Sequence, residues 1–67
     1  MGFHKKIEYK QTETMVYFVD DNGLIQGTLK SYTPDKDREL REELLLYTQE
    51  YKDGLPIEEK VSYFYSV

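Results

Sequence analysis

The stretch VYFVDDNGLIQGTL, residues 16–29, carries the strongest local structural signal in this chain of 67 residues. Asn22 and Gly23 lie between two runs that are rich in β-branched and aromatic residues. Both residue types tolerate a positive φ, which the two central positions of a type I′ hairpin turn require. The stretch therefore predicts a β-hairpin with a two-residue turn at Asn22-Gly23.

This turn also predicts which residues of the two strands face one another. Val16 would lie opposite Leu29, and Phe18 would lie opposite Gly27. Side chains alternate between the two faces of a strand. One face of the hairpin would then carry four apolar residues and form the core, namely Val16, Phe18, Ile25 and Leu29.

Two further segments have strand patterns. Residues 5–10 alternate Ile7 and Tyr9 with charged side chains, which is the period-two pattern of a half-buried strand. Residues 61–67 also alternate, and they are rich in aromatic and β-branched side chains. We expect a first strand over residues 5–10 and a last strand over residues 61–67.

A helix is predicted between the third and the last strand. Thr33, Pro34 and Asp35 supply a hydroxyl N-cap, a proline at the first helical position and an acid near the positive end of the helix dipole. Gly54 would be the C′ residue that ends the helix, and Pro56 would prevent its continuation.

Four apolar residues within this segment, Leu40, Leu44, Tyr47 and Tyr51, fall within about 60° of one another on a helix that turns about 100° per residue. The sequence therefore predicts a single α+β domain over residues 1–67, with the order βββαβ. It would consist of an antiparallel meander, one helix packed on one sheet face and a C-terminal strand. That strand would run parallel to the first and lie beside it, in the order 4-1-2-3.

Composition narrows the classes of function. The chain has no cysteine and one histidine, so disulfides are excluded and a structural zinc site lacks ligands. No apolar run reaches the roughly 18 residues that span a bilayer, and no apolar segment follows the basic N-terminus as in a secretory signal. The lack of cysteine fits a reducing compartment. We expect a soluble, cytoplasmic protein.

Motifs for catalysis, metals or cofactors are not recognisable. His4 is the only imidazole, and the sequence fixes neither a nucleophile nor an orienting carboxylate beside it. Residues 20–23 are acidic but lack the ligand spacing of a calcium-binding EF-hand loop, and no glycine-rich phosphate loop follows. We therefore expect no enzyme, no cofactor and no metal.

The candidate partner-binding surface combines a sheet face and a helix flank. One helix covers only one face of a small sheet, so the hairpin face with Tyr17, Val19 and Leu24 would stay uncovered. Leu45 and Leu46 would project away from the apolar stripe of the predicted helix. Both sets would add exposed apolar surface.

Three glutamates, Glu39, Glu43 and Glu50, would line up with Leu46 along one flank of the predicted helix. This flank is either a solvated helix surface or a docking surface for a basic partner.

Charge and size favour a binding protein. Thirteen acidic and nine basic residues give a net charge of −4, which disfavours nucleic acid. We predict a protein-binding accessory or inhibitor module, a role common among small acidic proteins, including those of phages and mobile elements. The alternative is a nucleic-acid-binding protein that uses the basic N-terminal strand (Lys5, Lys6 and Lys10), with Tyr63 and Tyr65 stacking on bases. Core packing of these two tyrosines is the competing interpretation.

Self-association is also predicted, because a chain this short buries only about 60% of the surface that its unfolded form exposes. We expect a two-fold homodimer that uses the uncovered sheet face, the helix flank, or the edge of the last strand, Val61–Val67. That edge contains no proline, and its only charge is Lys60 at its start. The same surface could instead receive a different protein.

Overall fold

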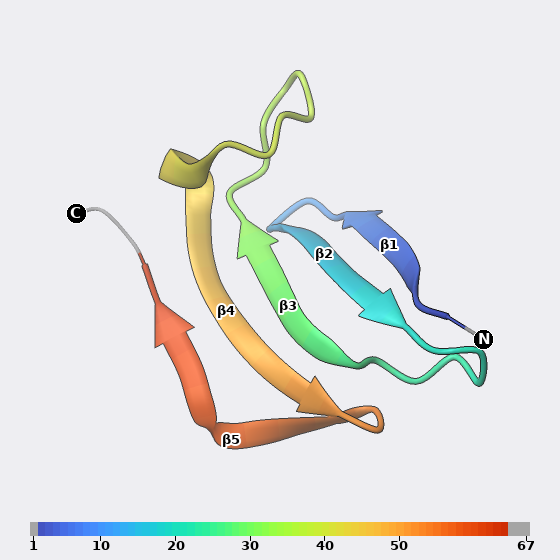
Figure 1. Ribbon diagram of the computed structural model, residues 1–67. Coiled ribbons are helices and arrows are strands. Elements are labelled where there is room, and N and C mark those ends of the chain that lie inside the picture. Colours follow the sequence, from blue (N-terminus) through green and yellow to red (C-terminus); the bar gives the residue numbers. More distant parts are fainter. Residues whose placement is uncertain (1, 65–67) are drawn as a thin grey trace.

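The computed structural model describes residues 2–64, which form an antiparallel sheet with strand order β1-β2-β3-β4-β5 (Figure 1). One short 3₁₀ turn, η1, precedes β4. The elements are β1 His4–Tyr9, β2 Thr14–Val19, β3 Gly27–Tyr32, η1 Glu42–Leu44, β4 Leu45–Lys52 and β5 Leu55–Tyr63. Within residues 2–64, no helix is both long and apolar enough to cross a membrane.

The predicted α+β class is wrong, because residues 2–64 contain no α-helix and the part of the predicted helix over residues 45–52 is strand β4. The sequence of β4, LLYTQEYK, also fits a period of two, and its tyrosines and threonine favour strands. Pairing of β4 with a neighbour on each side satisfies its backbone groups, so sheet formation prevailed over the helical pattern.

The predicted helix end is a hairpin turn instead. Asp53 has φ 52° and Gly54 has φ 82°, and Lys52 pairs with Leu55. Two consecutive positive φ values define the type I′ turn that joins antiparallel strands most tightly. Pro56 is therefore a residue of edge strand β5, where its missing N–H is tolerated.

The predicted helix start is part of a connection over residues 33–44. The carboxylate of Asp35 accepts hydrogen bonds from the backbone N–H groups of Asp37 and Glu39. Arg38 has φ 57°, which interrupts any helical run. Asp35 thus closes a local turn instead of lying in the first turn of a helix, and Thr33, the predicted N-cap, donates its N–H to the Leu44 carbonyl.

The β2–β3 hairpin is confirmed, but its turn has three residues rather than two. Asp20 donates its N–H to the Leu24 carbonyl and accepts a hydrogen bond from Gly23, which has φ 83°. The Asp20 carboxylate also accepts the N–H groups of Asn22 and Leu24. A type I turn followed by a left-handed glycine forms this three-residue loop.

Two features change the register. The three-residue turn pairs Val19 with Ile25, and two extra residues on the β3 side near Gly27 then bring Val16 opposite Lys30, not Leu29. The net change from the predicted register is one residue. A shift by one residue moves every side chain of a strand to the other face. The predicted core face is therefore wrong, because Leu29 lies on the face opposite to Val16 and Phe18.

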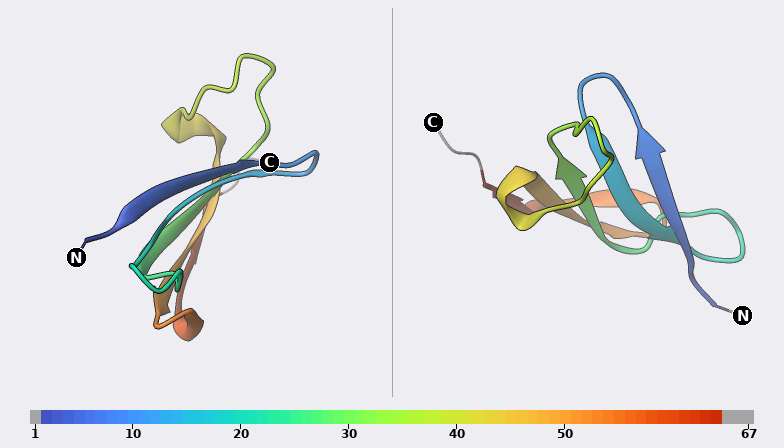
Figure 2. Two further views of the ribbon diagram at one scale, coloured as in Figure 1. Left: turned by 90° about the vertical axis from the view of Figure 1, so that its right-hand side faces the viewer. Right: turned by 90° about the horizontal axis from the view of Figure 1, so that it is seen from above.

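The strands form a single curved sheet (Figure 2), and side chains on both of its faces are buried. We call one the groove face (Val16, Phe18, Lys30 and Tyr32) and the other the reverse face (Val19, Leu29, Ser31 and Tyr47). Both faces contribute to the buried set, which consists of Thr14, Val16, Val19, Leu29, Ser31 and Tyr32. The shortest dimension is 17 Å, so a second packed layer is missing from the part of the chain described here.

The first strand is confirmed as β1, antiparallel to β2. The predicted last strand overlaps β5 at residues 61–63, while residues 65–67 lie outside the described residues. The predicted order 4-1-2-3 is wrong, because β5 pairs with β4 at the edge farthest from β1. The polypeptide forms a simple meander, so strands that follow one another in sequence are neighbours in space.

Candidate binding surface

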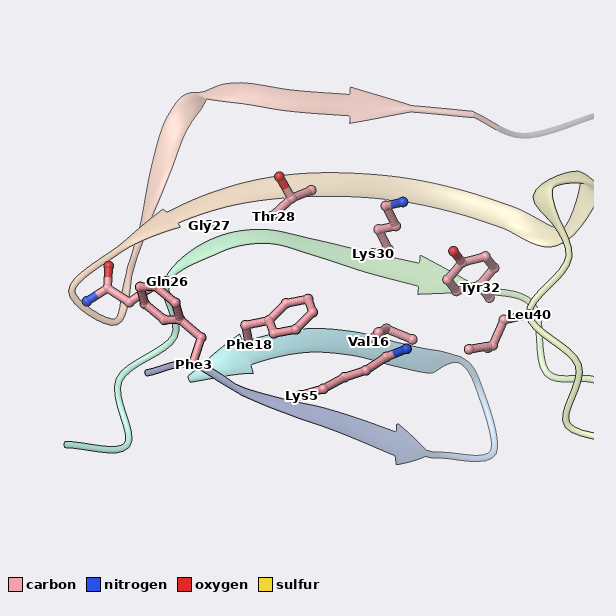
Figure 3. Close-up of a pocket in the computed structure, with 10 residues that line it drawn as sticks. All are labelled: Phe3, Lys5, Val16, Phe18, Gln26, Gly27, Thr28, Lys30, Tyr32 and Leu40. Atoms are coloured by element: carbon pink, nitrogen blue, oxygen red, sulfur yellow. The ribbon is translucent and has the colours of Figure 1, made fainter. Parts of the chain in front are cut away.

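A groove of about 710 Å³ opens on the groove face of β1, β2 and β3 (Figure 3). Its lining residues come from β1, β2 and β3, from the segments just before β1 and β3, and from one loop. They are Phe3, Lys5, Val16, Phe18, Gln26, Thr28, Lys30, Tyr32 and Leu40, together with the backbone of Gly27.

The groove exists because β2 and β3 separate along their length. They pair over residues 14–16 of β2, then diverge until the N–H of Gln26 donates to the Phe18 carbonyl. Gly27, with φ 83°, begins β3 at this divergence and has no side chain to fill it. The resulting gap is floored by buried Val16 and Tyr32 and walled by Phe18.

Leu40 closes one end of the groove from the connection over residues 33–44 (Figure 3). It was expected in the apolar stripe of a helix, and it instead reaches the sheet from a loop. At the other end, two turns are joined because Gln26 donates to both Asp20 and Asp53 at 2.9 Å. Its hydrogen bond also lowers the pKa of Asp20.

Two lysines give the groove its charge. Within residues 2–64, ion pairs involve His4, Lys10 and Arg41, and neither Lys5 nor Lys30 takes part in one. The groove thus presents two ammonium groups beside aromatic side chains. It suits a ligand with an apolar body and negatively charged groups.

The reverse face carries a hydrogen-bonded cluster. Ser31, which is fully buried, donates its hydroxyl to the Glu13 carboxylate at 2.6 Å. Burial, together with the charge of Glu13, raises the pKa of the nearby Tyr47. The Tyr47 ring lies 5.9 Å from the Tyr63 ring, centroid to centroid. The raised pKa keeps the Tyr47 hydroxyl protonated to a higher pH than in a free tyrosine.

The sheet residues predicted to bind a partner do not form one exposed patch. Val19 is buried, and Tyr17 is half-buried with its hydroxyl bonded to Glu8, which raises the pKa of Tyr17. Leu24 is 41% exposed at the β2–β3 turn.

The residues of the predicted helix flank do not lie together in the structure, because the segment forms a loop and strand β4 instead of a helix. Glu39 and Glu43 both form ion pairs with Arg41, at 3.6 Å and 3.4 Å. Glu50 accepts a hydrogen bond from the Thr28 hydroxyl. Leu45 and Leu46 are half-buried at the start of β4 and do not share a flank with the glutamates.

Sequence reasoning missed the groove. Phe18 was assigned to the core, and Phe3, Lys30 and Tyr32 were given no role. A usable signal was present, since Asp20 followed by Gly23 at the fourth position fits a type I turn. That reading would have placed Phe18 and Lys30 on one face.

No group of three or more His, Cys, Asp or Glu side chains that could hold a metal ion occurs within residues 2–64. The chain matches no protein-family model, and no curated protein or solved structure with significant similarity was found. Its function is therefore inferred from the geometry of its own surfaces.

Proposed function

We propose that the protein is a cytoplasmic, non-catalytic accessory or inhibitor module that binds another protein. The observation that supports this function is the apolar groove on β1–β3, whose two lysines form no ion pair with any residue in the range 2–64. The groove would take an apolar, acidic segment of the partner.

The openness of the groove supports a protein segment as the occupant. Phe3 is 67% exposed and Phe18 is 41% exposed, so the walls cannot enclose a ligand. Sites for small molecules bury roughly 70–90% of the ligand surface. A segment that remains attached to its own protein needs only one side covered, which fits this groove better.

Charge supports an acidic segment. Lys5 and Lys30 line the groove, although the chain as a whole carries a net charge of −4. A local positive site on an acidic protein selects acidic groups through short-range contacts rather than long-range attraction.

A displayed library of random peptides tests the proposal. Peptides that combine apolar and acidic residues should be enriched on the wild-type protein and lost on Phe18→Asp. Leu24→Asp is the matched control, because Leu24 is also 41% exposed but lies outside the groove. Equal enrichment on the wild type and Phe18→Asp would contradict the proposed function.

A charge-reversal variant of the groove tests whether its lysines select acidic peptides in the same library. Lys5→Glu should shift the enriched peptides from acidic to basic sequences. The control is Lys6→Glu, because Lys6 pairs with Tyr17 and so lies on the reverse face. An identical shift with both variants would rule out the groove as the binding site.

Single-stranded nucleic acid is the second candidate ligand, because Lys5 and Lys30 share the groove with Phe3, Phe18 and Tyr32. The basic N-terminal strand supports it less than the sequence suggested, since Lys6 lies on the reverse face and Lys10 is 3.8 Å from Glu8. Fluorescence anisotropy with a labelled oligothymidine distinguishes the two ligands. Binding that weakens with salt and with Lys5→Glu, but not with Lys6→Glu, would favour nucleic acid.

A further inference from the structure

The two edges of the sheet differ in how they discourage further strand pairing. The β1 edge carries His4, Lys5, Lys6 and Glu8 within six residues. Charged side chains of this kind protect an edge strand. At the opposite edge of the sheet (Figure 1), β5 carries Pro56, Glu58, Glu59 and Lys60 in its first six residues, whereas its last three residues, Val61–Tyr63, have neither a charge nor a proline. Within residues 2–64, this last part of β5 is the edge segment with the least protection against another strand.

The backbone groups that this edge offers follow from the register of β4 and β5. The N–H of Phe64 donates to the Leu46 carbonyl at 2.7 Å, and Ser62 lies opposite Thr48. In an antiparallel ladder, hydrogen-bonded and non-hydrogen-bonded pairs alternate. The N–H and C=O groups of Val61 and Tyr63 therefore point away from β4.

We propose that the Val61–Tyr63 edge pairs with the same edge of a second copy of this chain, antiparallel, with the two-fold axis at Ser62. Val61 then lies opposite Tyr63 of the second copy, and each such pair exchanges two hydrogen bonds. Ser62 lies opposite Ser62 of the second copy in a non-hydrogen-bonded position. Each outward N–H group of Val61 and Tyr63 in one copy then has a C=O group of the other copy as its partner.

Side chains at the edge fit this pairing. Tyr63 is 67% exposed and Phe64 is 49% exposed. Tyr63 would gain Val61 of the second copy on the side away from Tyr47. Lys60 would face Phe64 of the second copy, so no like charges oppose each other. A two-fold axis at Lys60 would instead place two ammonium groups directly opposite.

The chain also exposes enough surface for an interface of standard size. The chain exposes 5151 Å², whereas a folded monomer of 8.0 kDa exposes about 4,450 Å². The surplus of about 700 Å² is close to the roughly 800 Å² that each partner buries in a standard interface. This inference goes beyond the proposed function, because the groove lies on β1–β3 and the edge lies on β5.

Sedimentation equilibrium between about 10 μM and about 1 mM tests the pairing, since standard interfaces hold in this range. The wild type should dimerise, and Ser62→Lys should weaken the dimer at least about tenfold, because two ammonium groups would meet at the axis. Ser62→Glu should do the same, whereas an equimolar mixture of the two variants should form a heterodimer. Thr12→Lys, at an exposed site in the β1–β2 loop, is the control and should not change the dimer.

Amide hydrogen exchange provides a second measurement that needs no variant. The N–H groups of Val61 and Tyr63 should exchange more slowly as the protein concentration rises, while Ser62 should be protected at every concentration. A monomer throughout, a dimer that survives Ser62→Lys, or variants that do not pair in the mixture would each overturn the inference. Loss of the dimer in Phe18→Asp but not in Ser62→Lys would place the contact in the groove instead.

Discussion

The three-residue β2–β3 turn leads to a sharp contrast between two alanine substitutions. Leu29 is 5% exposed on the reverse face, whereas Phe18 is 41% exposed in the groove. A two-residue turn would have placed both in one core. We expect Leu29→Ala to be much more destabilising than Phe18→Ala, although phenylalanine is the larger side chain.

The magnitudes follow from burial. Leu29→Ala removes three buried carbon groups, worth about 0.8 kcal/mol each, and leaves part of a cavity, so the loss should be about 3 kcal/mol. For Phe18→Ala, only about three fifths of the side-chain transfer term is lost and the open groove leaves no closed cavity, which gives about 1 kcal/mol. A chain of 67 residues has a total stability of about 3–10 kcal/mol.

Equilibrium unfolding in urea, followed by circular dichroism, measures both losses. With a slope of about 1 kcal/mol per molar urea, the midpoint should fall by about 3 M for Leu29→Ala and about 1 M for Phe18→Ala. Complete unfolding of Leu29→Ala would agree with the same reasoning. Equal losses, or a larger loss for Phe18→Ala, would refute the register described here.

Three further predictions concern the turns and the reverse face. Gly54→Ala and Gly23→Ala should each cost about 1 kcal/mol in thermal unfolding, because both glycines have φ above 80°, and Gly54→Ala should cost more since an added Cβ meets a leucine side chain at 3.2 Å. Because the pKa of Tyr47 is raised in the folded state, the contribution of its neutral hydroxyl to stability is fully present below the ordinary pKa of 10.0 and is lost as pH rises through the folded pKa. Urea midpoints measured from about pH 8 to about pH 11 should therefore fall less in Tyr47→Phe than in the wild type. Ser31→Ala should cost about 1.5 kcal/mol, and a double-mutant cycle with Glu13→Gln should show that the two losses are not additive.

Much of the strand content was predictable from local pattern. Ile7 and Tyr9 alternate with charges in β1, and the acidic, glycine-containing turn after Val19 marks a hairpin. These signals depend on only a few neighbouring residues, so they hold without knowledge of the rest of the fold. The exact register was not predictable from Asn22-Gly23 alone, because Asp20 bonds to the turn and lengthens it by one residue, and because β3 has two extra residues near Gly27 where the strands diverge.

The segment before Gly54 shows why the helix prediction failed. Leu44, Tyr47 and Tyr51 fit a helical period, but Tyr47 and Tyr51 also fit an alternating strand, and a short apolar run does not separate the two. The Asp53-Gly54 pair is also a hairpin signal, and its interpretation as a helix end removed β4 and the first part of β5 from the prediction.

The groove could not be predicted from the sequence, because the length of the β2–β3 turn and the helix were both predicted wrongly. Phe18 and Lys30 share a face only in the register of the longer turn, and Leu40 reaches them only because residues 33–44 form a loop. A surface assembled from three strands and a loop has no motif of its own in the sequence.

The lengths of the connections in the meander have a consequence for how the chain folds. The connections before β2, β3, β4 and β5 contain 4, 7, 12 and 2 residues, counted between the strand bounds. Every extensive strand contact joins consecutive strands, which gives a low contact order for an all-β chain and favours rapid folding. Because closing a longer loop costs more entropy, we expect the β4–β5 and β1–β2 hairpins to form early. Docking of β3 onto β4 closes the longest connection and would then limit the folding rate.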